Sequence, residues 1–514
     1  MQATKQMIET SDLVHISFQD EPRNKKPVGI YWLQVLAVKA TGLQNLATAW
    51  PYRLPSVLGA WLAVLAVFGF GKRLFDAQTG LTAAAMLATS LIVVIEAHLA
   101  KTDAVLLTTV TLAMLILSKF YMAPEGRAPR LPTALLFWMA LGVGFLIKGP
   151  LILMVTGATV AALCAADRSG RWLKALHAES GIPVAIAVVL PWALAASTGG
   201  GGSFFTDAVS QDLLPKLAGG QESHGALPGV HLLALFATAW PWSILVPFAG
   251  ILAWRQRAKP AVRFCLAWLL PAWLIFELVP TKLPHYTMPL FPALMLLIAA
   301  SFAEFKTLQA LMNRPAGLIF RAIWAVLSVA LGSAVIWAAY TYGHTLPIAI
   351  LAAVVAAAAG VFGIIALSKY DSPGTVIPLG AISVVFGFLI VTGVVPNLDR
   401  LAISRRLAEV SAPYRNQDTI MAVAGFHEPS AVFLLGTKTW LTSWDGATGL
   451  LLSDQVDLMT VPKSDISRVE EEFARWNMKM NTLAEIEGRN YSKGEDVHLV
   501  LVSASPTSPD LSTP

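Results

Sequence analysis

Long apolar segments recur along most of this chain, and they constrain its fold more than any other feature. The hydrocarbon core of a bilayer is about 30 Å thick, so a helix that crosses it needs about 17–25 apolar residues. Twelve segments fit this description: 54–71, 80–98, 103–120, 133–148, 150–166, 182–198, 230–253, 262–279, 286–303, 317–340, 346–367 and 375–396. Only 13% of all residues are charged, whereas soluble domains carry about 25%. The sequence therefore predicts an all-α polytopic membrane protein.

The segment after residue 396 has a different character. Short apolar runs at 419–424 and 497–502 are bounded by turn residues, and residues 464–477 show a charged helical pattern. Such runs are typical of buried strands that alternate with surface helices. We therefore expect four parts: a juxtamembrane segment (1–53), a transmembrane domain of twelve helices (54–396), a small α/β domain (397–503) and a disordered tail (504–514).

Basic residues divide unequally between the two sides of the predicted helices. One side receives fifteen of them: Lys72, Arg73, Lys119, Arg127, Arg130, Arg168, Arg171, Lys174, Arg255, Arg257, Lys259, Arg263, Lys306, Arg314 and Lys369. The short loops of the other side hold four: Lys101, Lys148, Lys216 and Lys282. Because basic loops stay in the cytoplasm, the second side and the C-terminal domain are predicted to be extracytoplasmic.

This topology also places residues 1–53 outside, although they are basic and follow no apolar run. Basic segments resist translocation. We therefore expect a first transmembrane helix upstream of residue 1 that this sequence does not contain.

A basic stretch between prolines precedes the first apolar run. Within residues 21–34, the cations Arg23, Lys25 and Lys26 come before the aromatic pair Tyr31 and Trp32. At a bilayer surface the cations would lie near the head groups and the rings at the interface, where amphipathic rings are favoured. Ordinary interfacial aromatics would give the same pattern. We interpret the stretch as a site for a ligand that is both anionic and lipidic.

The predicted outer loops carry titratable groups that topology does not require, in the segments 96–103, 148–150, 207–225 and 281–289. Each has a structural alternative. Asp103 can cap a helix, and Lys148 can extend to the interface. Glu222 and His224 can be solvated loop residues, and Lys282 can be an interfacial anchor. Ionisable groups at membrane depth nevertheless favour a functional site. Their grouping with Arg23 and Lys26 on one face favours an anionic lipid head group.

Other function classes receive little support. The two cysteines, Cys164 and Cys265, lie in or beside apolar runs and show no metal-ligand or disulfide spacing. The net charge of +5 comes from basic residues scattered between apolar runs, so it does not indicate a nucleic-acid partner.

Several motifs together resemble a known family. They are, in order, Arg23-Asn24-Lys25-Lys26-Pro27-Val28-Gly29-Ile30-Tyr31-Trp32-Leu33, Arg53-Leu54-Pro55-Ser56, Lys101-Thr102-Asp103, Lys148-Gly149-Pro150 and Lys282-Leu283-Pro284-His285-Tyr286. This series resembles the bacterial aminoarabinose (lipid A) transferases, a branch of the group that includes the protein O-mannosyltransferases. The resemblance covers nearly the whole membrane portion.

The resemblance implies a GT-C-type glycosyltransferase with a periplasmic active site. The donor would be a polyprenyl-phosphate-linked sugar, and the acceptor lipid A, another glycolipid or a protein. Lys26 would contact the donor phosphate with help from Arg23, Lys148, Lys282 and Tyr286. Asp103, Glu222 and His224 would be catalytic. Tyr31, Trp32, Arg53 and His285 would line the substrate site.

Two departures from the family limit this reading. Family members carry an acidic Asp-Glu-x-Arg-Tyr-Ala loop before the region where this sequence begins. In its absence, Glu222, Asp103 and Glu21 are the candidate bases, in that order. Many members also have Glu where this chain has Lys25. A carboxylate there could join His224 in binding a divalent metal, the one cofactor that the resemblance suggests. Lys25 cannot do so, which disfavours a metal site in this chain.

Two other functions fit the same residues. A transporter or flippase for a polyprenyl-linked substrate could also use twelve helices, although the chain shows no internal repeat, which many transporters have. An inactive truncated homologue is the other alternative.

Overall fold

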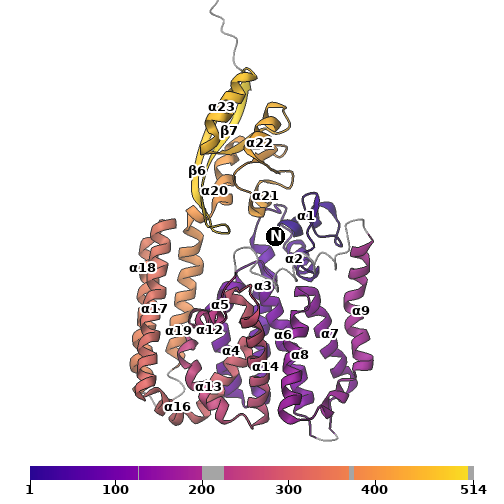
Figure 1. Ribbon diagram of the computed structural model, residues 1–514, viewed down its shortest axis with the longest axis vertical. Helices are drawn as coiled ribbons and strands as arrows, with labels where there is room; N and C mark the ends of the chain where they lie inside the picture. The colour runs from indigo at the N-terminus through magenta and orange to yellow at the C-terminus, as the bar shows by residue number, and fades with distance from the viewer. Residues whose placement is uncertain (125–126, 199–224, 370–375, 507–514) are drawn as a thin grey trace, which may run out of the picture.

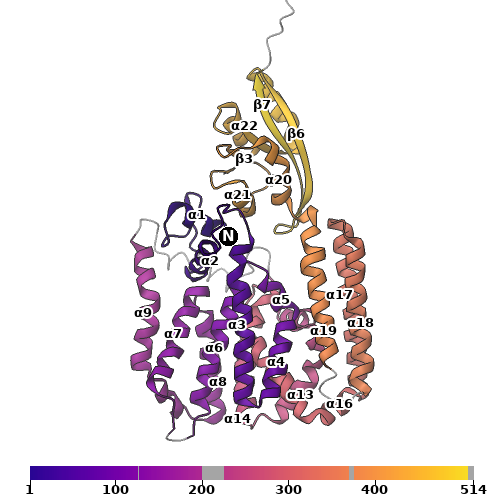
Figure 2. The same cartoon turned by 180° about the vertical axis from the view of Figure 1, so that it is seen from behind.

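The computed structural model describes residues 1–124, 127–198, 225–369 and 376–506. A bundle of roughly parallel and antiparallel helices carries a small α/β domain at one end (Figure 1). The N-terminal helices lie at the same end, beneath that domain (Figures 1 and 2). We call this end the domain end and the opposite end of the helices the basal end. The predicted fold class, an all-α membrane protein with a small C-terminal α/β domain, is confirmed.

The helices of the bundle follow the predicted apolar runs to within a few residues at most ends. They are α3 (Trp50–Leu74), α4 (Ala77–Thr89), α5 (Leu91–Ala97), α6 (Asp103–Tyr121), α7 (Leu131–Lys148), α8 (Leu151–Asp167), α9 (Ala178–Ser197), α12 (Val230–Thr238), α13 (Val246–Arg255), α14 (Pro260–Leu278), α15 (Phe291–Ala300), α16 (Phe305–Met312), α17 (Pro315–Tyr342), α18 (Leu346–Lys369) and α19 (Val376–Phe388).

Short 3-10 segments join some of these helices: η1 (Arg171–Leu176), η3 (Trp242–Leu245), η4 (Pro284–Leu290) and η5 (Ser301–Glu304). A π-helical segment, η7 (Leu389–Val394), extends α19. Within the described ranges, nine helical segments are long and apolar enough to cross a membrane, or eleven if two bent pairs count as one span each. The 17-residue helix α8 is apolar but shorter.

Two of the predicted continuous spans are broken. The span predicted at 80–98 bends by 62° between α4 and α5, and the span predicted at 230–253 bends by 120° between α12 and η3. Ser90 leaves the helical conformation at the first break, and its hydroxyl donates to the Met86 carbonyl over 2.7 Å. The Leu91 N–H that this break leaves free donates to the Trp240 carbonyl at the second break over 3.1 Å. The donor at the first break and the acceptor at the second thus satisfy each other. Inside a bilayer, backbone polar groups need such partners because no water is available.

The N-terminal segment forms short elements that cap the domain end. They are α1 (Gln2–Thr10), the antiparallel pair β1 (Ser17–Phe18) and β2 (Glu21–Pro22), and α2 (Gly29–Thr41). None of them is long enough to cross a bilayer. The described structure therefore keeps the basic stretch at 21–34 outside the spanning helices, as predicted from its sequence.

The C-terminal domain is built on a five-stranded sheet in the order β4-β3-β5-β7-β6. Its strands are β3 (Met421–Val423), β4 (Trp440–Leu441), β5 (Leu458–Pro462), β6 (Met478–Asn490) and β7 (Glu495–Pro506). β3 pairs in parallel with β4 and β5, whereas β7 is antiparallel to β5 and β6. Its helices are α20 (Ile403–Ser411), α21 (Pro429–Leu435), α22 (Trp444–Leu452) and α23 (Ile466–Arg475). Apolar residues alternate between two cores, one on each face of the sheet.

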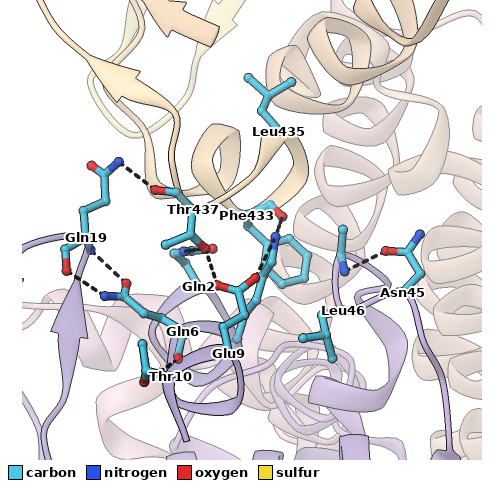
Figure 3. A network of polar contacts seen from close by, with 12 residues as sticks. Gln2, Gln6, Glu9, Thr10, Gln19, Asn45, Leu46, Phe433, Leu435 and Thr437 are labelled. Carbon is cyan, nitrogen blue, oxygen red and sulfur yellow. Dashed lines mark hydrogen bonds and ion pairs between the residues drawn. The ribbon is translucent and has the colours of Figure 1, made fainter. Parts of the chain in front are cut away.

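Polar contacts dock this domain onto the N-terminal segment (Figure 3). The Lys5 ammonium donates to the Phe433 carbonyl over 3.0 Å. The Thr437 hydroxyl donates to a Glu9 carboxylate oxygen over 2.6 Å and accepts from the Gln2 side-chain amide over 3.0 Å. The buried Tyr52 ring from α3 packs against the Phe433 ring in a T-shaped arrangement with a centroid separation of 5.4 Å. The α/β domain therefore rests on α1 and α3 through its helix α21.

Candidate active site

The basic loop reaches the helical bundle because α2 begins in close contact with α7. A Cβ atom at Gly29 would lie 2.7 Å from the Leu146 carbonyl oxygen, so only glycine permits this approach. Pro27 and Val28 are buried just before it. The loop that ends at Lys26 is thereby fixed beside the end of α7, two residues before Lys148.

Arg23, Lys26 and Tyr31 line one cavity at the domain end, as their common motif suggested. The cavity has a volume of about 180 Å³, and Lys101 and Thr102 complete its polar wall. Burial raises the pKa of the Tyr31 phenol, while the nearby Arg23 guanidinium, which hydrogen-bonds this phenol, opposes the rise. The phenol is therefore a neutral hydrogen-bond donor beside three cationic side chains. Such a wall suits an anionic group.

A buried ion pair lies next to this cavity. Asp103 is the first residue of α6 and only 3% exposed, and it is paired with the Lys148 ammonium at the end of α7. α6 approaches α3 closely here, since a Cβ atom at Gly59 would lie 3.0 Å from the Ala104 carbonyl. Lys26 acts electrostatically on Asp103 as well. Asp103 makes no side-chain capping hydrogen bond, because the N-cap of α6 is Thr102, although a negative charge in the first turn suits the helix dipole.

His285 connects this ion pair to a second carboxylate. Its Nδ1 atom lies 3.6 Å from Glu96 Oε1, and its Nε2 atom lies 3.7 Å from Asp103 Oδ1. The Tyr286 ring packs edge-on against the imidazole at a centroid separation of 5.2 Å. The Lys148 ammonium lies 5.3 Å from the centroid of the same Tyr286 ring, within the range of a cation–π contact. Sequence motifs from three distant segments thus meet at one point.

Glu96 and Lys101 belong to this cluster, although the sequence analysis assigned them no role. The Lys101 ammonium donates to Glu96 Oε1 over 3.3 Å. The other oxygen, Oε2, is buried and has no hydrogen-bond partner within the described ranges. The sequence did carry a signal for Glu96, because it lies at the end of an apolar run. Ionisable residues in membrane helices are rare and usually functional.

Other predicted site residues lie elsewhere. The Lys282 ammonium is buried and donates to the Glu277 carbonyl over 2.8 Å and the Val279 carbonyl over 2.5 Å, so it closes the C-terminus of α14. Trp32 is 40% exposed, and its indole N–H donates to the Leu13 carbonyl. Arg53 is exposed near the start of α3. These contacts give no support to substrate roles for the three residues, which stay predictions.

Glu222 and His224, the remaining predicted catalytic residues, lie outside the described residues. Among residues that the structure does describe, no group of three or more His, Cys, Asp or Glu side chains could hold a metal ion. The cluster itself contains four cations, which would repel a divalent cation; they are Arg23, Lys26, Lys101 and Lys148.

An apolar groove leads away from the cluster along α7. It has a volume of about 530 Å³ and runs between α7, α8 and α9. Trp138, Phe145 and Leu190 are among the side chains that line it. Since α7 ends at Lys148, one helix connects the apolar groove to the charged cluster.

Together, the fold and the cluster define a class: a polytopic membrane protein with charged groups gathered at one membrane surface beneath an extramembrane domain. Comparison with solved structures identifies this fold. ArnT from Cupriavidus metallidurans bound to undecaprenyl phosphate superposes with a TM-score of 0.76 and 17% identity, over 100% of this chain and 93% of that one. An oligosaccharyltransferase from Archaeoglobus fulgidus gives a TM-score of 0.53 with 11% identity, over 92% of this chain and 66% of that one.

Sequence comparisons point to the same group. Residues 25–194 match the profile of the dolichyl-phosphate-mannose-protein mannosyltransferase family. An undecaprenyl phosphate-alpha-4-amino-4-deoxy-L-arabinose arabinosyl transferase of Pseudomonas paraeruginosa is 30% identical over 57% of this chain and 53% of its own length. The Pectobacterium atrosepticum protein of the same name is 30% identical over 58% and 52%. The chain thus spans about half the length of these relatives. The predicted resemblance is confirmed: this chain is similar in sequence to the aminoarabinose transferases over about half of its length, and its fold is that of ArnT.

Proposed function

We propose that this protein transfers a sugar from a polyprenyl-phosphate donor to a membrane-associated acceptor, lipid A or a similar glycolipid, at the periplasmic face of a bacterial inner membrane. One observation carries the proposal: Arg23, Lys26 and Lys101 surround a cavity at the membrane surface, next to the buried pair of Asp103 and Lys148. The relatives' names support the donor class, and the positive-inside rule supports the orientation.

The cationic wall suits the leaving group of such a reaction. As the bond between the anomeric carbon and the donor phosphate breaks, its electron pair stays on the phosphate oxygen, and the negative charge there grows. Cations fixed in advance stabilise this charge more in the transition state than in the ground state. Lys26 would be one of these cations, since it lines the cavity together with Arg23 and Lys101. The polyprenyl chain would lie in the apolar groove along α7.

The acceptor side requires a place for a proton only if the acceptor is a hydroxyl. The new bond would form between the acceptor oxygen and the anomeric carbon, and the hydroxyl proton would pass to a carboxylate. Glu96 and Asp103 are the two carboxylates of the described cluster, and Glu96 Oε2 accepts no hydrogen bond from a described residue. A phosphate acceptor would bring no proton and would need no base.

The test compares two neighbouring lysines. Membranes with the wild-type protein, Lys26→Ala or Lys25→Ala receive undecaprenyl phosphate-linked 4-amino-4-deoxy-L-arabinose and lipid A, and the product is measured by mass. Lys26→Ala is expected to lower transfer by roughly 10²–10³-fold, as loss of one preorganised charge-stabilising group does. Lys25→Ala, an exposed neighbour, should retain transfer. Equal activity of both variants would overturn the phosphate assignment.

A second assay distinguishes a transferase from the transporter alternative. A flippase would move the labelled donor across sealed vesicles without forming a new glycosidic product, whereas a transferase forms product in detergent, where no sealed compartment exists. If product forms instead from another donor, such as a polyprenyl phosphate-linked hexose, the assignment of the sugar changes but the reaction class stays the same.

A further inference from the structure

A second charged cavity lies at the basal end, on the opposite side of the bundle from the candidate active site. It has a volume of about 750 Å³ and is enclosed by the last residues of α6 and α8, the segment η1 and the first residues of α14. α6 has 19 residues from Asp103 to Tyr121, which corresponds to about 28 Å of helix. The two cavities are therefore separated by nearly the full hydrocarbon thickness of a bilayer.

Positive charge exceeds negative charge among the described residues of this basal cavity. These residues include the cations Arg171, Lys174 and Arg263 and one carboxylate, Asp167. Arg263 is already paired with Asp167, and Tyr121 interacts with both of them. Arg171 and Lys174 are exposed, and neither has an ion pair within the part of the chain that the structure describes. Two cations consequently remain for an anionic ligand.

Trp172 supplies an independent sign that the cavity holds a hydrogen-bond acceptor. Its ring packs edge-on against Tyr121 at a centroid separation of 5.6 Å. Its indole Nε1 atom is buried and has no hydrogen-bond partner among the described residues. Since a buried indole N–H normally finds an acceptor, an oxygen atom of a bound ligand would satisfy it.

The segment η1 is held in the position of an interfacial element. Leu176 is buried, and its carbonyl accepts a hydrogen bond from the Trp138 indole over 2.8 Å. Leu173 packs against the apolar core, while Arg171 and Lys174 on the same segment remain exposed. The segment thus turns apolar side chains toward the bundle and cations toward the level of the head groups.

We infer that this basal cavity binds the head group of an anionic phospholipid, with its phosphate between Arg171, Lys174 and the Trp172 indole. Basic pockets between transmembrane helices on the cytoplasmic side commonly bind such head groups. A volume of about 750 Å³ lies within the range of small-molecule sites. Because the cavity adjoins the hydrocarbon region, the acyl chains of the lipid can remain in the bilayer while the head group occupies the site.

The experiment measures lipid binding to the purified full-length protein by native mass spectrometry and thermal unfolding in detergent. Phosphatidylglycerol, phosphatidylcholine and inorganic phosphate are added separately. Phosphatidylglycerol should bind and raise the unfolding temperature more than phosphatidylcholine. Equal effects of the two lipids would overturn the anionic specificity. An equal effect of inorganic phosphate would identify a phosphate site without a lipid requirement and would overturn the proposal.

Variants locate the binding. Arg171→Gln/Lys174→Gln should weaken phosphatidylglycerol binding at least tenfold, the size expected for losing one charge-assisted hydrogen bond. The matched control Arg130→Gln/Arg255→Gln removes two cations that do not line the cavity. Unchanged binding in the first variant, or an equal loss in the control, would contradict the site.

A conservative change of the tryptophan distinguishes hydrogen bonding from packing. Trp172→Phe keeps a ring against Tyr121 and removes the N–H. Its phosphatidylglycerol affinity should fall roughly two- to tenfold, as expected for one neutral hydrogen bond, with no change in the unfolding temperature without lipid. If the affinity of Trp172→Phe stays the same while the Arg171→Gln/Lys174→Gln variant loses binding, the phosphate does not contact the indole and the proposed geometry is wrong.

Discussion

Positive charge is concentrated at both ends of the bundle, but the charged side chains are buried at the domain end and more exposed at the basal end. At the domain end, the side chains of Asp103 and Lys148 are 4% and 14% exposed. At the basal end, the paired side chains of Asp167 and Arg263 are 23% and 30% exposed. A buried charge is expensive unless a partner compensates it, whereas an exposed one is screened by water and salt. Buried pairs therefore fix geometry at the domain end, and exposed cations at the basal end suit adhesion to a charged surface.

Asp103→Asn is expected to have the largest effect. It preserves side-chain shape but leaves the Lys148 ammonium buried without its carboxylate. Breaking a buried pair in this way lowers the free energy of unfolding by about 3–5 kcal/mol, which denaturant titration in detergent would measure. The double variant Asp103→Asn/Lys148→Met removes the stranded charge and should recover part of the loss. If its loss equals the sum of the two single losses, the pair is not energetically coupled.

Lys282→Met comes next and separates a structural lysine from a phosphate-binding one. The variant loses the donor that closes the C-terminus of α14 through the Glu277 and Val279 carbonyls. Loss of a charged donor to buried carbonyls should reduce the free energy of unfolding by about 1.5–3 kcal/mol. The KM for the donor should stay close to that of the wild type at a temperature where the variant is folded. A donor KM that rises as much as in Lys26→Ala would restore the predicted phosphate role.

Thr437→Val probes how the extramembrane domain is attached at the domain end. The change keeps the shape of the side chain but removes a hydroxyl that bonds Glu9 and Gln2. The expected loss is about 1 kcal/mol, seen as faster proteolysis between the membrane part and the α/β domain. Thr482→Val, at an exposed position in β6, is the matched control. Identical cleavage rates in both variants would mean that this contact does not hold the domain.

Asp167→Asn at the basal end should have the smallest effect. The partly exposed pair with Arg263 contributes at most about 1 kcal/mol, and added salt should reduce the difference further. The variant also frees Arg263 from its carboxylate partner in the basal cavity. Phosphatidylglycerol should therefore bind at least as tightly as to the wild type. If Asp167→Asn lowered the free energy of unfolding as much as Asp103→Asn does, the proposed difference between the two ends would be wrong.

The helices could be predicted from the sequence because the bilayer demands uninterrupted apolar length. The breaks at Ser90 and before Trp242 could not. Hydropathy averages over a window and records composition, whereas a bend depends on where a freed N–H finds a partner. That partner, the Trp240 carbonyl for Leu91, is distant in sequence.

The site was predicted in part. Asp103, Lys148, His285 and Tyr286 meet in the structure because loops of one side converge at one membrane surface. Lys282 does not join them in the structure, because its ammonium bonds the Glu277 and Val279 carbonyls, and its phosphate role stays a prediction. Glu96 was overlooked because a carboxylate at a helix end has many ordinary roles. In the structure, its distance of 3.6 Å to His285 and its buried Oε2 atom single it out.

Pro429 at the start of α21 lines the same cavity as Arg23 and Lys26. The α/β domain is therefore a wall of the pocket as well as an appendage joined by contacts to α1. Replacing this domain by another would therefore also change the wall of the cavity. Among related chains, residues 1–20 and 429–439 should consequently change in concert, and chimaeras that combine the membrane part of one relative with the domain of another should fail unless both segments come from the same parent.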